Sequence, residues 1–212
     1  MSQEFDLPHD NSIAASTSKA GPSTAAGATG GLAEIVEMIA AGLYSLASML
    51  VGEGADSERL VEMAIANAEI SVCQNPQEAV ESSRRALSAA ALDLLGGRDP
   101  DSLTAPEGLA PASTCIEDDD LASAGISSEE LERMIAGPER DRVRNWLASL
   151  PTAMRTVFIL RAVAGFNARE TAEMLKAHGG PQAGAWTPEA ARELFRQGLC
   201  SLASQLIQAS AR

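Results

Sequence analysis

Arg192, Arg196 and Gln197, near the C-terminus, are the side chains whose types and spacing best fit a specific chemistry. Arginine binds phosphate oxygens and guanine edges, and glutamine binds adenine edges in the major groove. All three fall on the outward face of a helical run that starts at Thr187, and the apolar residues of that run face inward. Such a helix is the DNA-reading part of a helix-turn-helix.

The residues before this run follow the order that a helix-turn-helix requires. Pro151 suits the start of a supporting helix, which Gly165 ends. Asn167 and Glu170 then have the spacing of a capping box, so a short second helix is expected after Asn167. Residues 176–186 form the expected turn before the last helix.

A plainer interpretation of the arginines stays open. Glu189 and Glu193 lie three or four positions from Arg192 and Arg196, which is the spacing of ion pairs on one helix. The arginines would then be solvated surface charges with no nucleic-acid partner.

Composition predicts an all-α protein. The 212 residues are 45% hydrophobic but only 3% aromatic, which favours small, alanine-rich helical bundles. The net charge of −13 is unevenly divided: residues 1–132 carry 23 acidic and five basic side chains, whereas residues 133–212 carry six acidic and 11 basic ones. This division indicates a modestly basic module tied to an acidic one.

No pattern of a catalytic, metal or cofactor site is present. Cys73, Cys115 and Cys200 are far apart and odd in number, and His9 and His178 lie near no ligand cluster. The glycine pairs lack the Lys and Ser/Thr of a phosphate-binding loop. We therefore expect no enzyme, no metal and no cofactor.

Apolar periodicity and breaker residues predict four segments: a disordered tail (1–30), a helical domain (31–97), an acidic flexible linker (98–128) and a helix-turn-helix domain (129–212). Within the second segment, helices are expected at 32–51, after a cap at Asp56, and at 77–95 before Gly96-Gly97. In the linker, residues 117–120 are all acidic. They are either a solvated, self-repelling run or an acidic mimic that competes with nucleic acid for the basic module.

The N-terminus lacks the charged start and apolar run of a signal peptide. The longest apolar stretch, residues 32–51, contains Glu34 and Glu37 and is expected to be a core helix rather than a membrane span. These features predict a cytoplasmic, reduced protein without a membrane partner.

The segment LPTAMRTVFILRAVAGFNARETAEML, residues 150–175, resembles the second domain of bacterial RNA polymerase sigma factors of the extracytoplasmic-function type. The matching landmarks, in order and without gaps, are Leu150-Pro151, Arg155, Val157-Phe158, Leu160-Arg161, Gly165, Glu170, Ala172 and Leu175. The resemblance implies a helix-turn-helix that binds double-stranded promoter DNA through Thr187, Arg192, Arg196 and Gln197.

A second part of the chain is similar to the first conserved helix pair of that family. The matching positions are Leu43-Tyr44, Leu46-Ala47, Leu50, Gly52, Ala55-Asp56, Glu58 and Leu60-Val61. The resemblance implies a surface that docks on core RNA polymerase, formed by Asp56, Glu58, Leu60, Val61 and Glu62. It further implies a role in transcription initiation or its regulation, with an anti-sigma protein as another candidate partner.

The sequence departs from the family at two places, and an alternative function stays open. The helix that opens the promoter normally carries aromatic and basic side chains that stack on and bind the single strand, whereas residues 81–90 contain two arginines and no aromatic ring. The turn at 176–186 is also longer than the family's. The alternative is a non-catalytic interaction or regulatory module that kept the sigma architecture but lost promoter opening.

Overall fold

The computed structural model describes residues 25–67, 75–106, 115–116, 118–138 and 140–210. All regular elements in these ranges are helical and none is a strand, so the all-α prediction is confirmed. In chain order they are α1 (Ala25–Val51), α2 (Ala55–Asn67), α3 (Pro76–Arg98), η1 (Ala122–Ala124), α4 (Ser128–Ala136), α5 (Arg140–Ser149), α6 (Thr152–Ala162), α7 (Ala168–His178), η2 (Ala183–Ala185) and α8 (Pro188–Ser210).

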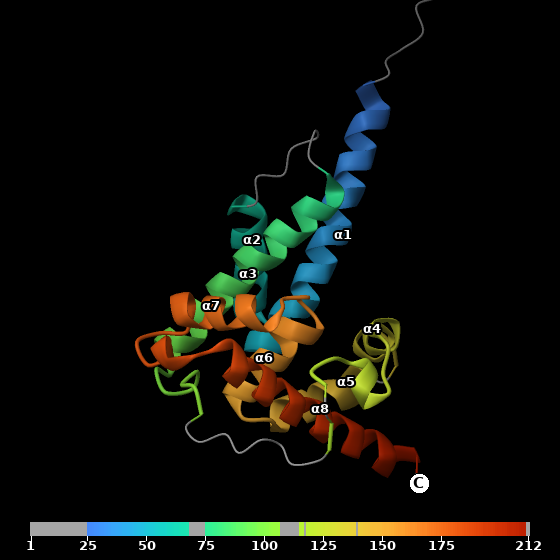
Figure 1. The fold of residues 1–212 in the computed structure, drawn as a ribbon. Helices are drawn as coiled ribbons and strands as arrows, with labels where there is room; N and C mark the ends of the chain where they lie inside the picture. Colours follow the sequence, from blue (N-terminus) through green and yellow to red (C-terminus); the bar gives the residue numbers. More distant parts are fainter. Residues whose placement is uncertain (1–24, 68–74, 107–114, 117, 139, 211–212) are drawn as a thin grey trace, which may run out of the picture.

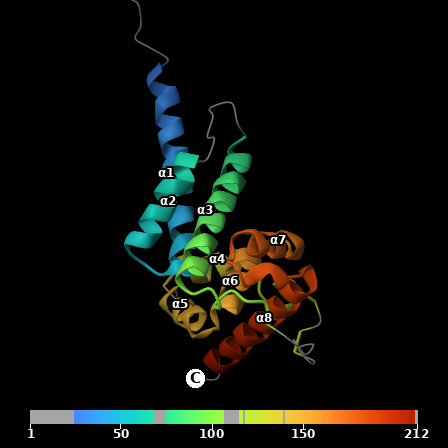
Figure 2. The ribbon, with the colours of Figure 1, turned by 90° about the vertical axis from the view of Figure 1, so that its left-hand side faces the viewer.

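The first three helices pack against one another, and the N-terminal part of α1 projects beyond the other two (Figures 1 and 2). Leu43, Leu46 and Leu50 are all buried, as their helical spacing predicts. α1 begins inside the stretch 1–30 that composition assigns to a disordered tail, and residues 1–24 lie outside the described part. Asp56 lies in the first turn of α2 rather than at the expected cap position.

The buried side chains of the other five helices belong to the same continuous core as those of α1–α3. α8 packs against α6 and α7, and α4 packs against α5. Trp146 of α5 meets Phe158 of α6 edge to face, with ring centroids 5.0 Å apart, and Phe158 also contacts Phe195 of α8 at 5.5 Å. Three of the chain's few aromatic rings therefore hold α5, α6 and α8 together.

Helices of the two expected domains contact each other. α3 packs against α7, and α1 packs against α6 (Figure 2). Polar contacts cross the same boundary as well, among them Arg85 of α3 with Glu170 of α7 at 3.0 Å, Arg144 of α5 with Glu53, and His178 of α7 with Asp93 of α3 at 3.2 Å. The division into two bundles stays a prediction.

The expected end of the third helix at Gly96-Gly97 is wrong, because α3 continues to Arg98. A Cβ atom at Gly96 would lie 2.7 Å from the carbonyl carbon and oxygen of Gly179, which follows α7. Gly96 thus allows α3 to approach the backbone beyond α7. Gly96 is needed here because a side chain would not fit against Gly179. This packing favours a helical conformation at Gly96 over a chain break.

The described parts of the expected linker contain buried side chains. Leu103 is fully buried, and Ile116 and Ile126 are 5% and 4% exposed. Within the predicted linker range, residues 98–106, 115–116 and 118–128 are described, and these parts of the chain pack on the helices.

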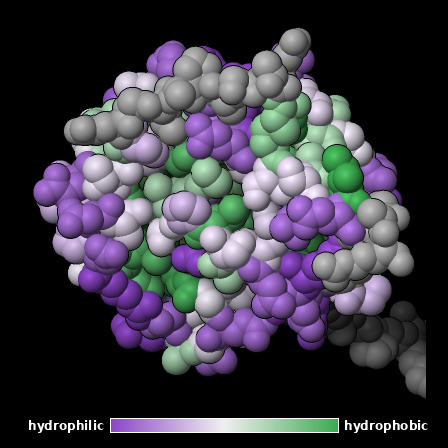
Figure 3. Space-filling model, turned by 90° about the horizontal axis from the view of Figure 1, so that it is seen from below, coloured by the Kyte–Doolittle hydropathy of each residue, from purple (hydrophilic) through white to green (hydrophobic). Residues whose placement is uncertain are grey.

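The C-terminal half of α8 borders a cavity of about 640 Å³. Its lining includes Ile126, Met134 and Leu206, together with the charged Glu130 and Arg133. Seen from below, the surface shows hydrophobic patches between hydrophilic side chains (Figure 3). None of the described helices is both long enough and apolar enough to span a bilayer.

Candidate nucleic-acid interface

Helix α7 begins at the capping box that the sequence predicts. The amide of Glu170 donates to Oδ1 of Asn167 at 2.9 Å, and the amide of Asn167 donates to Oε2 of Glu170 at 3.0 Å. Together with Arg85, the Asn167 amide lowers the pKa of the Glu170 carboxyl below its ordinary value. Glu170 therefore both starts α7 and ties it to α3.

The turn between α7 and α8 is shorter than the expected range 176–186. α7 continues to His178, so Lys176 lies inside the helix, and η2 occupies part of the remaining turn. Trp186 at the end of this turn is fully buried and donates from Nε1 to the carbonyl oxygen of Leu103 at 2.7 Å. Trp186 thus fixes the approach to α8, a role that the sequence analysis missed.

Thr187 and Pro188 open α8 as expected. The amide of Ala190 donates to Oγ1 of Thr187 at 3.1 Å, which satisfies one of the free amides of the first turn. Farther along, Leu194, Phe195 and Leu199 are buried against α6 and α7. This packing leaves the opposite side of α8 for its arginines.

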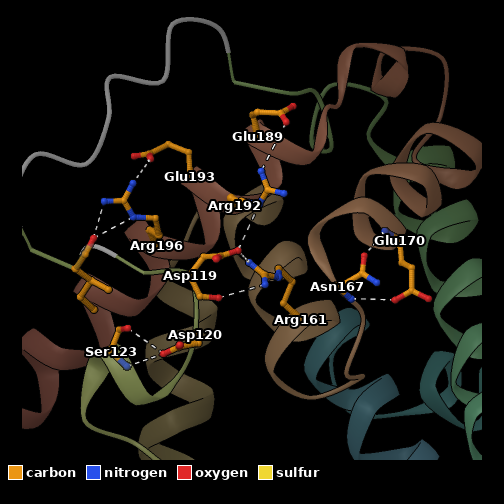
Figure 4. A network of polar contacts seen from close by, with 11 residues as sticks. Asp119, Asp120, Ser123, Arg161, Asn167, Glu170, Glu189, Arg192, Glu193 and Arg196 are labelled. Atoms are coloured by element: carbon orange, nitrogen blue, oxygen red, sulfur yellow. Dashed lines mark hydrogen bonds and ion pairs between the residues drawn. The ribbon is translucent and has the colours of Figure 1, made fainter.

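Three guanidinium groups from α6 and α8 gather on one face of this unit: Arg161, Arg192 and Arg196 (Figure 4). All three contact the same short stretch of chain, at Ile116 and Asp119. The structure therefore brings the two predicted α8 arginines together and adds Arg161 of α6, which the sequence offers only as a landmark of the resemblance.

Arg161 is the most deeply placed of the three, with a side chain that is 13% exposed. Its Nη1 donates to Oδ2 of Asp119 at 2.7 Å, and its Nη2 donates to the carbonyl oxygen of Asp119 at 3.2 Å. The guanidinium carbon lies 4.4 Å from the centroid of the Phe195 ring. The ring and the carboxylate together hold this cation in one orientation.

Arg196 binds the backbone rather than a carboxylate of the acidic run. Its Nε and Nη2 donate to the carbonyl oxygen of Ile116 at 3.0 and 2.6 Å. Its Nη1 donates to Oε2 of Glu193 at 3.1 Å, one of the helix pairs that the plainer interpretation predicts. With 22% of its side chain exposed, Arg196 is mostly covered by its own chain.

Arg192 is the most accessible arginine of the group, with 51% of its side chain exposed. Its Nε lies 3.8 Å from Oδ2 of Asp119, and its Nη1 lies 3.6 Å from Oε1 of Glu189. Gln197 donates from Nε2 to Oε1 of Glu193 at 3.4 Å. Both side chains thus have partners within the chain.

The acidic run is locally structured next to these arginines. Asp120 accepts from the amide and the hydroxyl of Ser123 at 2.8 and 2.9 Å, and these bonds lower the pKa of the Asp120 carboxyl. They anchor the start of η1, and the preceding Asp119 is directed at Arg161 (Figure 4). Glu117 lies outside the described residues. We call Ile116 and Asp118–Asp120 the acidic strap.

The candidate polymerase-docking residues lie on α2, but they are not equally accessible. Leu60 is 3% exposed and belongs to the core, and Val61 is partly buried. Asp56 binds Arg98 at the end of α3, with Oδ2 and Nη2 2.6 Å apart. Glu58 and Glu62 are exposed and one turn apart, so they are the members of this set that α2 presents at the surface.

Residues 81–90 of α3 are expected to stand where the sigma family has its promoter-opening helix. Several of their side chains contact other parts of this protein. Ser83 and Ser88 are buried in it, and Arg85 lies over the Phe166 ring at 5.2 Å and binds Glu170. Among the described residues, no three His, Cys, Asp or Glu side chains are placed to hold a metal ion.

Comparisons of this chain with known protein families, with curated proteins and with solved structures find no match.

Proposed function

We propose that this chain is a sigma-factor-like transcription initiation protein that binds promoter DNA through α6, α7 and α8 and core RNA polymerase through α2. In this proposal α6–α8 form the helix-turn-helix, and residues 98–128 link it to the polymerase-binding bundle. The observation that carries the proposal is the convergence of Arg161, Arg192 and Arg196 beside the N-terminal half of α8.

A cluster of guanidinium groups on one face fits a phosphate backbone. Asp119 and the Ile116 carbonyl already supply oxygen atoms to these donors, so phosphate oxygens can take the same positions. Arg192 is accessible enough to contact DNA first. Gln197, one position after Arg196, would then reach a base edge.

DNA binding at this face requires the acidic strap to leave it. The strap and the DNA compete for the same arginine donors. The apparent affinity for DNA is therefore the intrinsic affinity multiplied by the fraction of molecules in which the strap has left the arginines. This competition follows the acidic-mimic interpretation of residues 117–120.

The test begins with the full chain, which is used to select bound sequences from a pool of random duplex DNA. Fluorescence anisotropy then measures the affinity for the selected duplexes at several salt concentrations. Arg192→Ala and Arg196→Ala should each weaken binding and lower the salt slope by about one. Arg133→Ala removes the same charge from α4 and is the matched control. The DNA proposal fails if low-salt binding is absent, or if all three variants bind like the unmodified chain.

Polymerase binding is tested separately, by co-purification of core RNA polymerase with the full chain. Glu58→Lys combined with Glu62→Lys reverses the charge that α2 presents and should abolish recovery. Glu132→Lys reverses an exposed charge on α4 and should leave recovery unchanged. Equal recovery from both variants would contradict docking through α2.

The alternative function, a regulatory interaction module without promoter opening, is favoured by a different observation. The α3 segment at 81–90 has no aromatic ring for base stacking, and its Arg85 is committed to Glu170. Recovery of polymerase together with absence of duplex binding would select this alternative.

A further inference from the structure

Two cysteines meet where the acidic strap joins α8. Cys115 directly precedes Ile116, whose carbonyl oxygen is held by Arg196 at 2.6 Å. Cys200 lies four positions after Arg196, one helical turn farther along the same side of α8. The Arg196–Ile116 contact thus brings Cys115 into the neighbourhood of Cys200, and both thiols are free.

The environments of the two thiols differ. Cys115 is exposed, whereas Cys200 is partly buried. Burial, followed by the contact with Cys115, raises the pKa of Cys200 to about 11, so Cys200 is protonated at neutral pH. A small oxidant from solution therefore meets Cys115 first, and Cys200 is placed to react with the product.

We propose that Cys115 and Cys200 are an oxidisable pair whose disulfide fastens the acidic strap to α8. With hydrogen peroxide as oxidant, the Cys115 sulfur attacks one peroxide oxygen and the O–O bond breaks, which gives a sulfenic acid and water. The Cys200 sulfur then attacks the sulfenic sulfur and displaces a second water. In sum, two thiols and one hydrogen peroxide give one disulfide and two waters, and a dithiol reductant reverses the change.

The consequence of the disulfide rests on the proposed DNA binding. A covalent bond one residue from Ile116 keeps that carbonyl at Arg196 and keeps Asp119 close to Arg161. DNA must then displace an acidic strap that is tethered beside the arginines and therefore has a high effective concentration there. Oxidation thus closes the DNA-binding face, and reduction reopens it.

The first experiment detects the bond itself and does not depend on DNA. The full chain, with and without Cys73→Ser, is treated with hydrogen peroxide, and its peptides are mapped by mass spectrometry without reduction. One intramolecular cross-link between Cys115 and Cys200 is expected, absent in Cys115→Ser and in Cys200→Ser. A cross-link through Cys73, cross-links between chains, or irreversible oxidation of Cys115 with no cross-link would overturn the proposal.

The second experiment measures DNA affinity before oxidation, after oxidation and after re-reduction with dithiothreitol. Oxidation should weaken binding of the unmodified chain by roughly tenfold or more, reversibly. Cys115→Ser, at an exposed position, should fold normally by circular dichroism and bind equally well in all three states. Equal affinity of reduced and disulfide-bonded protein would overturn the proposed fastening of the strap. If the cross-link forms but no redox state binds DNA, the oxidisable pair stands and the DNA-binding function fails.

Discussion

Arg161 and Asp119 form an ion pair at 2.7 Å, although they are 42 positions apart in the chain. The contact joins α6, within the candidate helix-turn-helix, to the acidic strap, and the Phe195 ring lies beneath the guanidinium group. Fully exposed ion pairs contribute little to stability. This pair is partly covered, with 13% of the Arg161 side chain and 34% of the Asp119 side chain exposed. Its main effect, in our proposal, is on access to the DNA-binding face.

Asp119→Asn should therefore raise DNA affinity. Removing the carboxylate charge weakens the hold of the strap on Arg161 and Arg192 and frees both for phosphate. An increase of roughly threefold to tenfold is expected, which corresponds to about 1 kcal/mol. Anisotropy titrations with the selected duplex measure it.

Asp118→Asn is the matched control for this prediction. It removes the same charge one position away, from an exposed side chain. A similar gain from both variants would show that net charge, rather than the contact with Arg161, controls the affinity.

Trp186 is expected to be a main determinant of the α7–α8 geometry. Trp186→Phe keeps an aromatic ring but leaves the Leu103 carbonyl without its donor, which should cost about 1 kcal/mol of unfolding free energy. Trp186→Ala also empties a fully buried site and should cost about 3–5 kcal/mol. Urea unfolding followed by circular dichroism measures both. An unchanged stability of Trp186→Phe would contradict the role of the hydrogen bond, and equal losses would contradict a separate role for the buried ring.

The sequence was sufficient for features that depend on neighbours along the chain. The spacing of Leu43, Leu46 and Leu50 predicts a buried helix face, and the structure confirms it. Asn167 and Glu170 predict a capping box because both partners lie within one turn, and this box is present.

Features that depend on distant partners could not be predicted in this way. Asp119 reaches Arg161, and Trp186 reaches the carbonyl of Leu103, 83 positions away. Trp186 stands in a stretch of glycine, alanine and polar residues, and a large apolar side chain in such a turn was the available signal. Nothing local to Gly96 indicates that Gly179 lies against it.

Gly96→Ala should destabilise the protein even though alanine favours helices. The added Cβ would lie 2.7 Å from the Gly179 carbonyl group, so α3 and the turn after α7 must separate. A loss of about 1–3 kcal/mol is expected from this overpacking.

Gly97→Ala is the matched control, because a Cβ at that position would have no atom within 4 Å apart from its chain neighbours and the nearby backbone of its own helix. Alanine there should be neutral or stabilise the protein by up to about 1 kcal/mol. Thermal unfolding of both variants tests the pair of expectations, and a stabilised Gly96→Ala would disprove the close contact.

The capping box of α7 should make stability depend on pH on the acidic side. The pKa of Glu170 is lowered by the Asn167 amide and by Arg85, so the folded protein binds the Glu170 proton less readily than the unfolded chain does. The stabilising contribution of Glu170 is therefore complete above the ordinary pKa of 4.5 and is lost as the pH falls through the lowered folded value. Unfolding free energies from urea titrations between about pH 3 and 7 should fall on the acidic side.

Glu170→Gln should remove part of that acidic decline, because glutamine can still accept from the backbone but cannot titrate. Glu173→Gln, an exposed position on the same helix whose carboxylate pairs with Arg169, is the comparison. Glu173 bonds to the side chain of Arg169 rather than to a backbone amide at the start of α7, so its replacement should leave most of the decline in place. If Glu170→Gln showed the full decline of the unmodified chain, the loss would have to arise at other carboxylates with lowered pKa values, of which Glu130 in the α4 capping box is the nearest equivalent.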